Sequence, residues 1–246
     1  MLWWSILCFV ALFNLCLLFF SYRLLKKKLP TMSGDMQFFR KWQFRLASLY
    51  TLGCGFRSIL PRGDIRRIVL VDMWISAIAI GRSVATIAEL SFVAQWCFLL
   101  YEAGKNTGNK TIQLLAKIPF PMIVIAELFS WYACTTTNYI GTAVEESLWA
   151  VAAAIAVYGL YLARPYYEKA QRNFITTGIF LGIGYIFYMV LVDVPAYVTN
   201  WLAAEAAGKE YLSIWAGLHE VATTWHLTRA YACLLYTSPS PRDTLL

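Results

Sequence analysis

The stretch LWWSILCFVALFNLCLLFFSY at positions 2–22 decides the class of fold. It contains no charged residue, and about 20 apolar residues are enough for a helix to cross the ~30 Å hydrocarbon core of a bilayer. Arg23, Lys26, Lys27 and Lys28 follow it directly, while no basic segment precedes it and no small-residue cleavage site closes it. The stretch therefore predicts an uncleaved first span whose N-terminus lies outside.

The composition of the whole chain supports a membrane protein. Of its 246 residues 59% are hydrophobic and only 14% are charged, whereas a soluble domain has about a quarter charged residues. The net charge of +7 is typical of the basic loops that orient a membrane protein. We therefore expect an integral, multi-pass membrane protein with lipids, and other membrane subunits, as partners, and no binding of nucleic acid.

Further apolar runs predict helical spans, because a backbone in lipid must satisfy its own hydrogen bonds. The run at 42–60 is short and carries Arg45 and Arg57, so it either spans or lies at the interface. The runs lie at 42–60, 69–101, 114–136, 141–162, 174–198 and 200–231. The last of them, 200–231, either lies on the surface or begins a seventh span. They predict an all-α, polytopic transmembrane helix bundle of six to seven spans in a single domain, residues 1–232.

The loop charges give the orientation. Lys and Arg gather in the first, third and fifth connections between these runs, which places those connections in the cytoplasm and the N-terminus outside. The second connection disagrees, since it holds Arg57, Arg62, Arg66 and Arg67. An interfacial segment at 42–60 would account for these four residues.

The end of the chain has a different origin. The string CLLYTSPSPRD at 233–243 resembles one reading frame of a transposase adaptor used in sequencing libraries. We therefore expect residues 233–246 to be a non-native tail, and the native C-terminus to be missing after residue 232.

Charged residues inside the third run are the most informative feature, because a charge in a span costs about 2.5–3.5 kcal/mol on insertion scales. On one continuous helix Asp72, Arg82 and Glu89 would share a sector roughly 100° wide. In the fourth run Glu127 is followed at +3, +7 and +10 by Ser130, Cys134 and Thr137. The depths favour an Arg82–Glu127 pair, with Glu89 as the alternative partner of Arg82.

A second group of acids is predicted near the outer ends of the later spans. Glu145 and Glu146 open the fifth run, and Asp193 precedes Pro195 in the sixth. Glu145 and Glu146 can also be explained as first-turn carboxylates that complement the helix dipole. The predicted buried polar network comprises Asp72, Arg82, Glu89, Glu127, Glu145, Glu146 and Asp193.

No catalytic motif assigns an activity. The chain has only two histidines and lacks the Glu-x-x-His pairs of di-metal bundles, as well as zincin, P-loop and dinucleotide motifs. We expect no metal and no cofactor, and the catalytic residues, if any, are unknown. Three functions stay open. A structural or assembly subunit is slightly favoured over a proton-coupled transporter, channel or sensor, and over a membrane enzyme acting on a lipid or isoprenoid.

Overall fold

The computed structural model describes residues 2–226, and these residues form two compact units. Unit 1 consists of the described residues of Met1–Ser91 and Ile214–Leu246, and unit 2 of Phe92–Ser213. The predicted tail at 233–246, like the end of the last predicted run, lies outside the described residues. The single domain proposed for residues 1–232 stays a prediction.

By length and composition, five helical segments in the described chain can cross a membrane. They are Leu2–Thr31, Ile78–Asn106, Lys110–Thr136, Tyr139–Tyr166 and Lys169–Ala206. The structure is thus consistent with the predicted all-α helix bundle and has helices long and apolar enough to span a membrane, while the number of spans and the outside N-terminus stay predictions.

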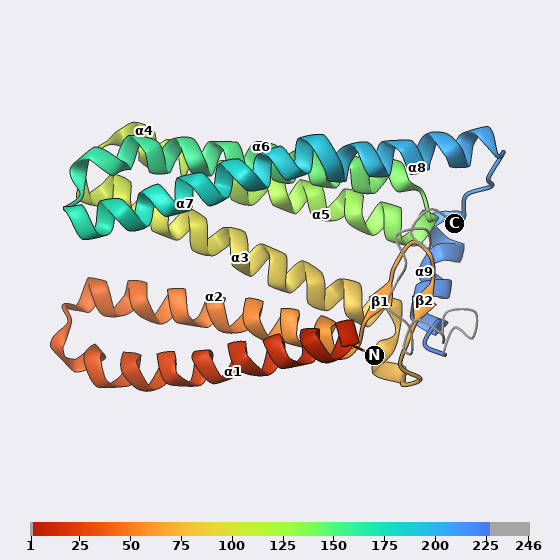
Figure 1. Ribbon diagram of the computed structural model, residues 1–246, viewed down its shortest axis with the longest axis horizontal. Coiled ribbons are helices and arrows are strands. Elements are labelled where there is room, and N and C mark those ends of the chain that lie inside the picture. The colour runs from red at the N-terminus through yellow and green to blue at the C-terminus, as the bar shows by residue number, and fades with distance from the viewer. Residues whose placement is uncertain (1, 227–246) are drawn as a thin grey trace. The chain divides into compact units, whose positions relative to one another are not determined.

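Unit 1 begins with a helical hairpin of α1 (Leu2–Lys28) and α2 (Gly34–Ile59), joined through the 3₁₀ turn Leu29–Thr31 (Figure 1). Pro30 lies in that turn and cannot continue α1, because its nitrogen carries no hydrogen. The Trp4 indole nitrogen donates to the Ser58 carbonyl oxygen at 3.1 Å, and at the opposite end of the hairpin the Tyr22 and Phe44 ring centroids lie 5.7 Å apart. The two helices therefore pair along their whole length.

A short β-hairpin follows, and it corrects the predicted third span. Strands β1 (Arg62–Gly63) and β2 (Ile68–Val69) pair antiparallel, a 3₁₀ turn covers Trp74–Ser76, and α3 (Ile78–Asn106) begins only afterwards. Asp72 therefore lies before α3. The prediction that it shares a helix face with Arg82 and Glu89 is wrong. The physical reason is that a short apolar run fits a strand or a helix equally well, so hydropathy joined Val69 of β2 and the residues after it to the helix.

The last predicted helix, 200–231, is also wrong as a continuous element. Helix α8 (Val194–Ala206) ends before Gly208, whose φ of +65° is a left-handed conformation that suits glycine at the end of a helix. Helix α9 (Ile214–Thr223) has 10 residues, about 15 Å at ~1.5 Å per residue, too short to span a bilayer. It lies beside the β-hairpin in unit 1, where Arg67 Nε meets Glu220 Oε1 at 3.1 Å.

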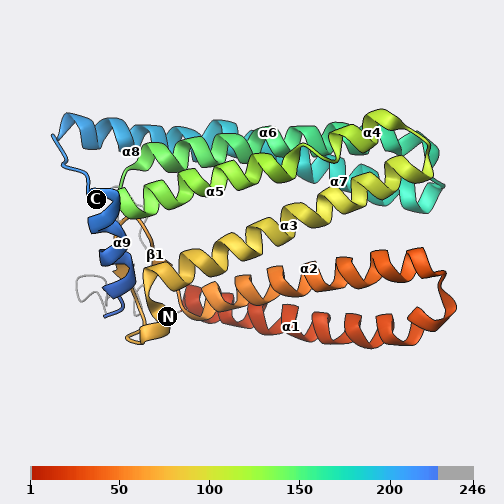
Figure 2. The same cartoon turned by 180° about the vertical axis from the view of Figure 1, so that it is seen from behind.

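Unit 2 contains the rest of α3 and four further helical segments. They are α4 (Lys110–Leu115), α5 (Pro119–Thr136), α6 (Tyr139–Ala163) with the 3₁₀ turn Arg164–Tyr166, and α7 (Lys169–Tyr188), which continues through the π-helical turn Met189–Asp193 into α8. Figure 2 shows α5 and α6 side by side. Leu100 and Ala116 form a buried cluster with Ala156 and Leu160 of α6. The π turn lies directly before Pro195, where a regular helical hydrogen bond would be lost.

Candidate functional site

A stripe of buried polar side chains runs along α5 in unit 2. Glu127, Ser130, Cys134 and Thr137 are all buried, as the +3, +7 and +10 spacing predicted. Pro119 at the start of α5 lacks a backbone donor where none is needed, so the helix runs without a break past these positions. Thr137 ends α5 in a left-handed conformation, φ 61°, which reverses the chain into α6.

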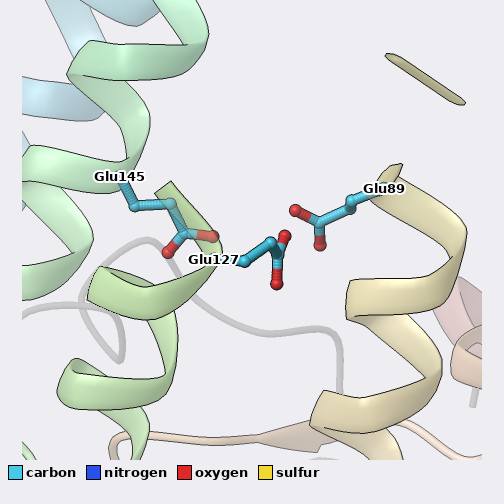
Figure 3. A group of neighbouring side chains, drawn as sticks. All are labelled: Glu89, Glu127 and Glu145. Carbon is cyan, nitrogen blue, oxygen red and sulfur yellow. The ribbon is translucent and has the colours of Figure 1, made fainter. Parts of the chain in front are cut away.

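The neighbouring helix α6 adds a second buried carboxylate. Glu127 is 3% and Glu145 5% exposed, and a carboxylate oxygen of Glu127 lies within 4.8 Å of one of Glu145. Figure 3 shows Glu145 projecting from α6 toward Glu127. The close approach depends on Gly141, because a Cβ there would meet the Phe129 carbonyl oxygen of α5 at 2.7 Å. We call Glu127 and Glu145 the carboxylate pair.

The helix-dipole explanation of Glu145 and Glu146 is wrong. Helix α6 starts at Tyr139, so both residues lie beyond its first turn, where the dipole has lost most of its effect. The N-cap is instead Asn138, whose Oδ1 accepts a hydrogen bond from the Ile140 nitrogen at 3.0 Å. Interaction with the helix dipole therefore does not explain why Glu145 is found in α6 and buried.

Tyr197 of α8 connects Asp193 with the acids of α6. Electrostatic interactions join Tyr197 to Asp193, Glu146 and Glu145, and Asp193 is hydrogen-bonded by Tyr188. Three of the predicted acids, Glu145, Glu146 and Asp193, therefore share one neighbourhood in unit 2. Sequence reasoning missed Tyr197, although its position four residues after Asp193 places both on one helix face.

Unit 1 holds the other predicted charges of α3. Arg82 Nη2 lies 3.3 Å from Glu89 Oε1, so the alternative partner of Arg82 is confirmed. Arg57 of α2 approaches the same oxygen, with Nη1 at 3.8 Å. The Arg82 side chain is 7% and that of Glu89 (labelled in Figure 3) 23% exposed. The pair between Arg82 and Glu127 joins residues of separate units and stays a prediction.

Asp72 takes part in a different contact. Its Oδ1 lies 3.2 Å from His226 Nδ1, and both side chains are mostly exposed. In the described residues Asp72 thus belongs to the surface of unit 1, which corrects its place in the predicted buried network. Its apolar sequence neighbours, Val71 and Met73, gave it the appearance of a residue within a span.

Lys209 is a further residue that the sequence did not reveal. Its ammonium lies 5.3 Å from the Tyr139 ring centroid and 5.5 Å from that of Tyr211, and it donates to the Thr137 carbonyl oxygen at 2.9 Å. Partial burial, and then the hydrogen bond that Tyr211 donates to Glu205 at 2.8 Å, raise the pKa of Tyr211 to about 12. These contacts fix the turn between α5 and α6, the two helices that carry the carboxylate pair.

The chemistry available to the carboxylate pair follows from its charge. Two carboxylates this close repel one another when both are ionised in a region of low dielectric. They can share one proton, as paired carboxylates in other proteins do, or offer oxygen ligands to a hard cation. Comparisons with protein-family models, with characterised proteins and with solved structures found no match to this chain.

Proposed function

We propose that this protein is a proton-coupled transporter or proton channel of a membrane, and that the carboxylate pair is its proton-binding site. The observation that carries the proposal is the placement of two buried carboxylates within 4.8 Å on adjacent helices that can both cross a membrane. Ionisable residues inside spans are costly, and they commonly mark ion pathways or proton relays. Glu146, Asp193 and Tyr197 supply further titratable groups beside the pair.

The test measures proton flux in liposomes that contain the purified protein. A potassium gradient with valinomycin drives protons, and an enclosed pH-sensitive dye reports them. We expect flux in the wild-type protein and a fall to the rate of protein-free liposomes in Glu127→Gln and in Glu145→Gln. Glu168→Gln is the matched control, because Glu168 is exposed before α7 and outside the candidate spans. Flux unchanged in both pair variants, with normal insertion, would contradict the proposal.

We propose six crossings, with the N-terminus outside. Helix α2 is not among the helices that are apolar enough to count as a span, but it pairs with α1 along its length and has 26 residues, about 39 Å at ~1.5 Å per residue. It therefore crosses with α1. Two of the four arginines that disagreed with the loop-charge rule have acidic partners: Arg57 contacts Glu89 and Arg67 contacts Glu220. Labelling of cysteines introduced at the ends of α1 and α2 tests this topology.

A structural or assembly role is the second candidate, and the contacts of Arg57 and Arg82 with Glu89 favour it. Such a network ties α2 to α3 and fixes their register, which needs no transport. It predicts that the wild-type protein shows no flux and co-purifies with other membrane subunits.

The lipid-enzyme hypothesis gains less support. A cavity of about 290 Å³ on unit 2 is lined by Ile125, Leu128, Phe129 and Tyr132, and none of these side chains is a carboxylate. An acyl chain would fit such a surface, but general acid–base catalysis would need a titratable group near the operating pH there.

A further inference from the structure

Helix α1 carries a polar amide on a side that does not face its partner helix. Its less exposed side chains Trp4, Cys8 and Ala11 follow one stripe, and the contacts of Trp4 and Cys8 with the Ser58 carbonyl oxygen direct that stripe toward α2. At 100° per residue Asn14 lies about 60° from Ala11, and it is exposed. Among the described residues of unit 1, Asn14 has no hydrogen-bond partner.

The position of Asn14 along the helix makes its exposure significant. Helix α1 spans Leu2–Lys28, so Asn14 lies near its middle and, in a bilayer, near the centre of the hydrocarbon core. There is no water at that depth to hydrogen-bond the amide, and an unsatisfied polar group in lipid is costly. Side chains such as Asn commonly resolve this cost by hydrogen-bonding across to another helix.

The residues around Asn14 follow the spacing of a helix–helix interface. They recur at alternating steps of three and four, which keeps them on one side of the helix when two helices supercoil. The members are Leu7, Val10, Asn14, Leu17, Ser21 and Leu24, and all six are exposed. We call this set the Asn14 stripe. It is apolar except for two residues seven positions apart, Asn14 and Ser21.

We propose that a second copy of this chain covers the Asn14 stripe, forming a parallel, two-fold symmetric dimer through α1. All copies insert in the same orientation, so a two-fold axis along the membrane normal brings the two Asn14 residues to the same depth. An amide side chain carries both donors and acceptors, so one Asn14 satisfies another. A symmetric interface of this kind needs no second partner sequence. A single polar residue in such a stripe also fixes register.

The proposal is tested by oxidative cross-linking of the full-length chain in liposomes. The background carries Cys8→Ala and Cys16→Ala, to remove the α1 thiols, and its own cross-linking gives the baseline. Leu17→Cys places a thiol in the Asn14 stripe, three residues after Asn14. Leu12→Cys is the matched control, because Leu12 is 59% exposed but lies about 160° around the helix from Asn14.

We expect disulfide-linked dimers from Leu17→Cys and baseline yield from Leu12→Cys. Adding Asn14→Leu should weaken association roughly tenfold, measured by energy transfer between labelled copies as they are diluted with lipid. Asn14→Gln, which keeps an amide, should retain the dimer. Because Asn14→Leu makes a span more apolar, insertion is preserved and loss of the dimer does not reflect failed folding.

Three outcomes would overturn the dimer. Equal cross-linking at Leu12 and Leu17 would mean non-specific collision, and undiminished association of Asn14→Leu would remove the amide from the interface. A monomer in which Leu17→Cys cross-links only within one chain would assign the Asn14 stripe to another helix of the same chain. None of these results depends on proton flux, so the proposed transport function and the dimer can fail separately.

Discussion

Replacing Gly141 by alanine should destabilise unit 2 through one atom. A Cβ at this position would lie 2.7 Å from the Phe129 carbonyl oxygen and 2.9 Å from the Ala133 Cβ. Ordinary contacts begin near 3.4 Å, so α5 and α6 would have to separate by roughly 0.7 Å. Both obstacles belong to the backbone or to a Cβ, and neither can rotate away as the end of a flexible side chain would.

The expected cost comes from overpacking, which is typically about 1–3 kcal/mol. For a chain of this size about 1 kcal/mol corresponds to roughly 2–4 °C in Tm, so Gly141→Ala should unfold several degrees below the wild type. The assay is thermal unfolding of the purified protein in detergent, followed by tryptophan fluorescence.

Gly184→Ala is the matched control for this experiment. Gly184 also lies in a helix, α7, but nothing within 4 Å would meet its added Cβ. Alanine there should leave Tm unchanged or raise it, since alanine favours the helix by about 1 kcal/mol over glycine. Equal Tm values for the two variants would refute the close approach of α5 and α6 at Gly141.

Three smaller effects follow from single contacts at the ends of the candidate spans or outside them. Asn109→Ala removes the cap of α4 and should cost about 1 kcal/mol, seen as faster hydrogen exchange at 110–115. The raised pKa of Tyr211 means that its stabilising contribution is complete below pH 10 and is lost as pH rises toward 12, and Glu205→Gln should lower this pKa in a spectrophotometric titration against Tyr211→Phe. Glu220→Gln breaks the contact with Arg67 and should speed exchange in α9, with slow exchange left intact as the contrary result.

The sequence predicts the long helices well because their signal is local. The start and end of α6 fall within two residues of the predicted 141–162, since a long apolar run leaves only its boundaries open. The start of α3 is wrong because most residues between the start of β2 and the start of α3 are apolar too. Strand pairing between Gly63 and Ile68 is a contact across a turn, and no period within so short a run reports it.

In the candidate site, too, the contacts within one helix could be predicted from the sequence, and the contacts between helices could not. Contacts along one helix follow from its period, which is why Arg82 and Glu89 could be paired from the sequence. Contacts between helices depend on their register and distance, which periodicity does not contain. Sequence spacing identified Glu127 and Glu145 separately, but their approach depends on Gly141, where a side chain is missing and the backbones come together.

The two units use glutamate in different surroundings, and this bears on which of them binds protons. In unit 1 Glu89 lies beside two cations, Arg57 and Arg82, at 3.8 and 3.3 Å from its Oε1. In unit 2 a carboxylate oxygen of Glu127 lies within 4.8 Å of one of Glu145, and both side chains are buried. This difference is the reason for placing the proton-binding step on α5 and α6, and for choosing Glu127→Gln and Glu145→Gln as its decisive variants.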